Sequence, residues 1–154
     1  VSNMDSDHHI ASVFNELLRN EIDDASLSRL LNVLENNVSS DSHRASVLKK
    51  VIQHNTLGLA SFPAYMSALK DIDSDQHKAD VFKTLARQNL NQTQLKQVLQ
   101  ATESIDSDYH KSESLLSFAS KVRDADSEVK DAYVAACKDI DSESHFGRAL
   151  KGIH

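Results

Sequence analysis

The chain has 154 residues, 40% of them hydrophobic and 26% charged, which is the balance of an ordinary globular domain. Seventeen Lys and Arg against 23 Asp and Glu give a formal net charge of −6, which disfavours a general binder of nucleic-acid backbones. The single cysteine excludes an internal disulfide framework and a multi-cysteine zinc site. No apolar run is long enough to predict a membrane span, and no signal-peptide pattern follows Val1.

A short phrase built on serine, an acid and histidine occurs five times. Its serines lie at 34, 34, 33 and 35 residues from one another: Ser6, Ser40, Ser74, Ser107 and Ser142. An acidic residue follows each serine, and a histidine stands three positions after it: His9, His43, His77, His110 and His145. Self-similarity at such a period indicates a repeat architecture. Positions within each repeat are numbered below from its serine, so the histidine occupies position +3.

Each phrase predicts the start of a helix. A serine hydroxyl at the N-cap accepts a hydrogen bond from a first-turn amide, and neighbouring acids favour the positive end of the helix dipole. Helical spacing places apolar residues at position +8, which holds Phe14, Leu48, Phe82, Leu115 and Leu150, and at +11, which holds Leu17, Val51, Leu85, Phe118 and Ile153. Position +5 is always small, which predicts close approach of a neighbouring helix: Ala11, Ala45, Ala79, Ser112 and Gly147.

The second half of each repeat also has helical apolar spacing, in stripes within residues 27–34, 62–72, 95–105 and 129–140. Two helices per repeat cannot bury their apolar faces alone, so we expect them to stack. The sequence predicts an all-α solenoid of about four and a half two-helix repeats and about nine helices. It predicts one helical-repeat domain over 1–154, with units 5–38, 39–72, 73–105 and 106–140. The helix over 141–154 is either an end cap or the point where a longer array was cut.

The phrase Ile-Asp-Ser-Asp-x-His-Lys-Ala-x-Val-Phe-x-x-Leu at 72–85 resembles bacterial HEAT-like helical repeats. Those repeats usually carry Glu at the position where this chain has His in all five units. Their Glu-based cap is therefore not carried over to this chain. The resemblance implies a scaffold without catalytic residues of its own. It also implies an extracytoplasmic protein, either secreted or membrane-tethered, or a region attached to a beta-lactam-sensor-type membrane peptidase.

The histidine column has three interpretations: first-turn capping or packing, a weak metal site, or pH sensing. His43, His77 and His110 are the metal candidates, although one ligand per repeat cannot build a zinc site alone because the ligands must converge. The Asp-Ser-Asp phrases lack the glycine turn and later glutamate of a calcium loop. Cys137 lies on an apolar stripe and is predicted to be a buried, inert thiol. With no catalytic or phosphate-loop motif in the sequence, we expect no enzyme activity and no cofactor.

Basic residues form one column at position +4, in Arg44, Lys78 and Lys111. Beside five acidic positions they predict a mixed rim, more consistent with a salt-bridge ladder than with a track for nucleic acid. The sequence therefore predicts a non-catalytic scaffold that binds a protein or peptide, with no nucleic acid and no insertion into a membrane. The alternative is a sensor or regulatory domain of a membrane-associated bacterial enzyme.

Overall fold

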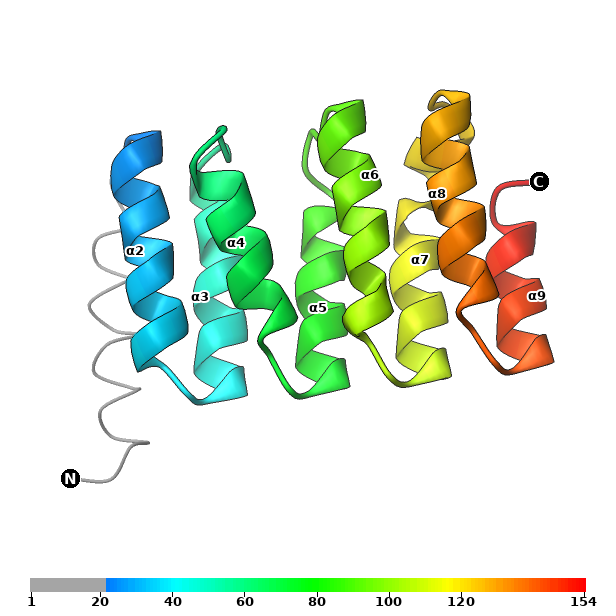
Figure 1. The fold of residues 1–154 in the computed structure, drawn as a ribbon, viewed down its shortest axis with the longest axis horizontal. Coiled ribbons are helices and arrows are strands. Elements are labelled where there is room, and N and C mark those ends of the chain that lie inside the picture. Colours follow the sequence, from blue (N-terminus) through cyan, green and yellow to red (C-terminus); the bar gives the residue numbers. More distant parts are fainter. Residues whose placement is uncertain (1–21) are drawn as a thin grey trace. The chain divides into compact units, whose positions relative to one another are not determined.

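A computed structural model describes residues 22–154, so the predicted cap at Ser6 and the histidine at position 9 lie outside the described part. Every regular element there is helical (Figure 1). The elements are α2 (Asp24–Asn37), α3 (Asp41–His54), α4 (Ser61–Lys70), α5 (Asp75–Leu85), α6 (Gln92–Ala101), the 3-10 turn η1 (Thr102–Ser104), α7 (Asp108–Arg123), α8 (Ser127–Lys138) and α9 (Glu143–Lys151). The predicted all-α class and the arrangement of helices in adjacent, solenoid-like pairs are confirmed.

The chain divides into two compact units, Val1–Val81 and Phe82–His154, and the division falls inside helix α5. Unit 1 contains α2, α3, α4 and the first part of α5. Unit 2 contains the remainder of α5 and helices α6 to α9. Each unit is described by itself below, and the single domain over 1–154 stays a prediction.

In unit 1, α2 lies beside α4, and α3 packs against α4 (Figure 1). The three helices bury Leu31, Leu48 and Leu69 completely. Tyr65 lies in the same core, and its hydroxyl donates to the carbonyl oxygen of Leu48 at 2.9 Å. Burial raises the pKa of Tyr65, so the hydroxyl keeps its proton and remains a donor. A buried polar group is thereby satisfied within an apolar core.

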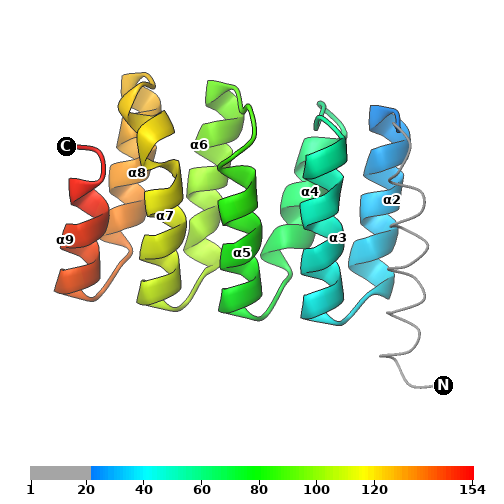
Figure 2. The ribbon, with the colours of Figure 1, turned by 180° about the vertical axis from the view of Figure 1, so that it is seen from behind.

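Unit 2 repeats this arrangement with different residues. Helix α6 lies beside α8, while α7 lies beside α9 and also packs on α8, as the view from behind shows (Figure 2). Leu99, Leu115 and Phe118 are completely buried between these helices. Tyr133 donates from its hydroxyl to the carbonyl oxygen of Ala149 at 2.6 Å, which ties α8 to α9.

The small residues at position +5 do not all play one role. Ala45, Ala79 and Ser112 are buried, with exposed fractions of 2%, 1% and 0%, as a close helix approach requires. Gly147 differs, because a Cβ atom added there would meet no atom within 4 Å. The close-approach interpretation is therefore wrong for Gly147. Its helix, α9, has open space at the position where the other three residues are enclosed.

Two further predictions concern the cysteine and the membrane. Cys137 is a buried free thiol, and burial raises its pKa to about 11. A thiol that stays protonated at neutral pH is a poor nucleophile, which fits the predicted inert role. Within the described part of the chain, every helix is too short or too polar to cross a lipid bilayer.

Candidate functional site: the helix-start edge

The starts of α3 and α5 in unit 1, and of α7 and α9 in unit 2, carry the repeated phrase, and positions 0 to +4 of these starts are called the helix-start edge of their unit. Each unit contains two such starts. The serine hydroxyl accepts from the backbone amide of the histidine in each one. The distances are 3.4 Å for Ser40 and His43, 3.3 Å for Ser74 and His77, 3.3 Å for Ser107 and His110, and 3.4 Å for Ser142 and His145. The histidine backbone, rather than its ring, is thus the capped group.

We predict that Ser74→Ala lowers the free energy of unfolding by about 1 kcal/mol, because the His77 amide loses its acceptor at the start of α5. Ser42→Ala is the matched control. Ser42 is exposed in the neighbouring phrase, and its replacement should stay within about 0.5 kcal/mol of the parent protein. Urea denaturation of the three proteins measures both effects. Equal stability of the two variants would show that the Ser74 hydroxyl does not stabilise the start of α5.

The acid at position +1 bonds to the following repeat. Asp41 accepts from the amides of Asp73 and Ser74, at 3.3 and 2.8 Å. Asp108 does the same in unit 2, accepting from the amides of Asp141 and Ser142 at 3.4 and 2.9 Å. The sequence prediction assigned these carboxylates only to the dipole of their own helix. The presence of an acid at position +1 of every repeat was the feature of the sequence that could have indicated a contact between successive repeats.

Asp24, in the first turn of α2, makes a similar contact with the start of α4. Its carboxylate accepts from the amides of Ala60 and Ser61, at 2.8 and 2.9 Å, and so holds the start of α4. The Ser61 hydroxyl, followed by these two amides, lowers the pKa of Asp24 below its ordinary value of 3.8. Gly58 is required beside it, since an added Cβ atom would lie 2.6 Å from the Asp24 Cγ atom.

We predict that the stabilising effect of Asp24 depends on pH. A carboxylate whose pKa is lowered by folding stabilises the native state above the unfolded-state pKa, and this effect is lost as the pH falls through the folded-state value. Asp24→Asn should therefore be less stable than the parent at pH 7, and the difference should shrink below about pH 4. Thermal melts between these pH values test the prediction. A difference that stays constant down to about pH 2 would contradict it.

The basic residues at position +4 point inward. Arg44, Lys78 and Lys111 are only 5%, 4% and 5% exposed. Lys111 pairs with Asp139 at 2.6 Å, and Arg44 pairs with Asp71 at 3.0 Å. The cations thus form ion pairs in both units, but with Asp71 and Asp139 at the ends of α4 and α8 and not with the acids of the phrase. The predicted mixed rim is wrong, because the cations are buried. The acids at these helix starts are exposed or half-buried, so the accessible charge of the edge is negative.

The imidazole rings of His43, His77, His110 and His145 are half-buried at their helix starts. Over residues 22–154, no group of three or more His, Cys, Asp or Glu side chains is placed to hold a metal ion. The metal candidates His43, His77 and His110 thus belong to no such cluster.

Position +2 is exposed in all four starts that the structure describes. Its residues differ from one repeat to the next: Ser42, Gln76, Tyr109 and Ser144. Tyr109 is 53% exposed, and its ring meets two histidine rings edge-on. The ring centroids lie 5.1 Å away for His110 in the same helix and 6.1 Å away for His145 at the start of α9. Sequence reasoning missed Tyr109, although an aromatic at an otherwise polar position of the repeat was a visible signal.

Comparison of the chain with protein-family models, with curated proteins and with solved structures finds no match. The resemblance to HEAT-like repeats therefore stays a prediction from the phrase at 72–85. The function proposed below rests on the residues of this chain alone.

Proposed function

We propose that this chain is a non-catalytic scaffold of HEAT-like repeats that binds a protein or peptide at the helix-start edge. The observation that carries the proposal is the contrast between position +2 and the positions around it. At +2 the side chain is exposed and changes from repeat to repeat. The serine, the acid and the histidine around it return in each described repeat, and the serine caps the helix in all four. Asp41 and Asp108 also bond to the following helix start.

These repeated residues are engaged in the fold. Ser107 caps its helix, Asp108 holds the next helix start, and Lys111 is buried against Asp139. A side chain at +2 can therefore change without disturbing the caps or the pairs. Stacked repeats create an extended surface, and variable exposed positions on a constant framework allow that surface to recognise a partner.

Tyr109 is the residue of this surface best suited to anchor a partner. Tyrosine is enriched among the residues that dominate binding energy, because it offers a large apolar ring with a polar tip. The neighbouring rings of His110 and His145 limit the positions that the Tyr109 ring can adopt. A side chain that is already restrained loses less conformational entropy when a partner binds.

Selection of binding peptides from a random displayed library tests this function without assuming a partner. We expect most selected peptides to lose about tenfold or more in affinity against Tyr109→Ala, as removal of an interface anchor does. Leu59→Ala and Val33→Ala are the controls, since these side chains are 98% and 45% exposed but lie outside the edge. Circular dichroism melts confirm that each variant is folded.

Two results would overturn the proposal. One is a set of peptides whose affinity is unchanged by Tyr109→Ala and is lost in Leu59→Ala or Val33→Ala. The other is a library that yields no peptide dependent on the helix-start edge. Either result would place recognition elsewhere or leave the edge as a purely structural feature.

A further inference from the structure

We propose that the partner segment at Tyr109 is basic, with a lysine or arginine side chain lying on the exposed tyrosine ring. This inference rests on the proposed function and names the chemistry of the partner. Two independent properties of unit 2 support it: a half-exposed aromatic ring and the sign of the surrounding exposed charge.

The first property is the Tyr109 ring itself. The ring is 53% exposed, and it meets the rings of His110 and His145 in T-shaped contacts with interplanar angles of 74°. An aromatic face carries the negative part of the ring quadrupole, which attracts an ammonium or guanidinium group. Arginine fits such a face well because its planar guanidinium also stacks.

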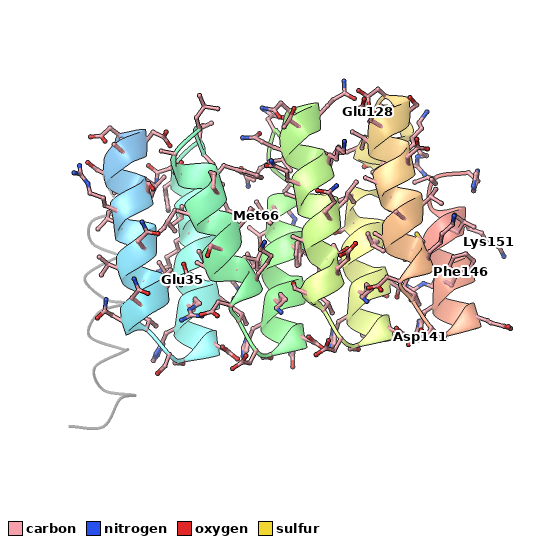
Figure 3. All side chains as sticks on the ribbon, in the orientation of Figure 1. Glu35, Met66, Glu128, Asp141, Phe146 and Lys151 are labelled. Carbon is pink, nitrogen blue, oxygen red and sulfur yellow. The ribbon has the colours of Figure 1, made fainter. Side chains whose placement is uncertain are left out.

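The second property is the charge next to the ring. Asp141 and Glu143 are exposed at the α8–α9 corner and in the first turn of α9, where Figure 3 marks Asp141. The start of α9, which carries them, lies beside Tyr109, because Asp108 accepts from the amides of Asp141 and Ser142 and because His145 contacts the Tyr109 ring.

The cations of this region do not outnumber those carboxylates, because Lys138, at the end of α8, is one exposed lysine against the three exposed acids Asp106, Asp141 and Glu143. Lys111 is buried against Asp139, and Arg148 pairs with Glu113 at 2.6 Å on the flank between α7 and α9. The exposed carboxylates beside the aromatic ring thus complement a basic segment and repel an acidic one. Such complementarity selects partners by sign and weakens as salt screens the charges.

Three acetylated peptides test the inference, alternating glycine with arginine, with serine or with glutamate. Tyrosine fluorescence reports binding directly, because the chain has no tryptophan and Tyr65 and Tyr133 are fully buried. Amide shifts in a nuclear magnetic resonance titration locate the site. We expect the arginine peptide alone to bind, shifting residues 106–110 and 141–145, and to weaken between about 50 and about 500 mM sodium chloride.

Variants separate a cation on the ring from simple attraction to a charged surface, and the amide-shift titration compares them, because the Tyr109 variants lack the exposed fluorophore. Tyr109→Phe keeps the aromatic face and should hold the arginine peptide as tightly as the parent. Tyr109→Leu keeps apolar volume without the ring and should weaken binding about two- to fivefold. Combined Asp141→Asn and Glu143→Gln should also weaken it, while Lys151→Gln on the far end of α9 should not.

The outcomes test the basic partner separately from the proposed function on which it rests. Equal binding of the glutamate or serine peptide, equal affinity of Tyr109→Leu and Tyr109→Phe, or shifts confined to other residues would overturn the basic partner. Library peptides that depend on Tyr109 but lack lysine and arginine would overturn it too, and would leave the proposed function standing. If no library peptide depends on the helix-start edge, the proposed function itself is wrong.

Discussion

Replacing Arg44 with alanine is expected to lower the free energy of unfolding by about 2–4 kcal/mol, the largest effect of any change at the helix-start edge. The Arg44 guanidinium is buried and donates to two carbonyl oxygens at the end of α2, those of Glu35 at 2.9 Å and Val38 at 2.6 Å. Alanine removes these charge-assisted bonds together with the packing of the arginine stem. Chemical denaturation followed by circular dichroism measures the loss.

Two companion variants assign the effect to its source. Asp71, the ion-pair partner of Arg44, has a side chain that is 58% exposed, so Asp71→Ala should cost less than about 1 kcal/mol. Arg44→Met keeps most of the apolar stem and should fall between the other two. If Asp71→Ala costs as much as Arg44→Ala, the ion pair and not the carbonyl bonds holds the arginine in place.

The fold was predictable because the same pattern, a serine cap followed by apolar residues at helical spacing, returns in each repeat. Apolar residues at +8 and +11 could only be buried by stacking, and Leu48, Val51, Leu115 and Phe118 are buried in the structure. The serine before each stripe fixed where the helix had to begin. A signal that is weak in one helix becomes strong when it returns several times at the same spacing.

The direction of polar side chains was less predictable. Arg44 stands in the first turn of α3, where periodicity gives its position on the helix but not the carbonyl oxygens that it reaches. Those oxygens belong to Glu35 and Val38, at the end of the preceding helix. Asp41 poses the same problem, because its partners are amides 32 and 33 residues along the chain. Contacts of this kind depend on the stacking geometry, which a single sequence does not supply.

Tyr109 shows a different limit. The repeated residues drew attention because they recur, whereas the exposed aromatic at +2 stands out only against a framework that is already known. Once the structure shows that position +2 is exposed in each described repeat, a tyrosine there needs a reason other than burial. The constant positions of the repeat thus predicted the helices, and the departure at Tyr109 is what the proposed binding surface rests on.

Position +5 offers the sharpest test of the stacking itself, because a larger side chain is expected to destabilise the fold at one of its residues and to stabilise it at another. Ala79 is 1% exposed, so Ala79→Leu must overpack the contact that encloses it. We expect this variant to lower the free energy of unfolding by about 1–3 kcal/mol. At Gly147 an added Cβ atom meets nothing within 4 Å, and alanine is the better helix former. Gly147→Ala should therefore raise the free energy of unfolding by about 0.5–1 kcal/mol.

Denaturant titrations of the two variants, with Ala45→Leu as a second enclosed example, measure both signs in one experiment. Ala45 is 2% exposed in unit 1, and its replacement should resemble that of Ala79. A neutral Ala79→Leu would show that the atoms enclosing this position yield easily, so that small size at +5 has no packing role. A destabilising Gly147→Ala would show that another element covers α9 at this point, because open space beside the glycine cannot oppose a single methyl group.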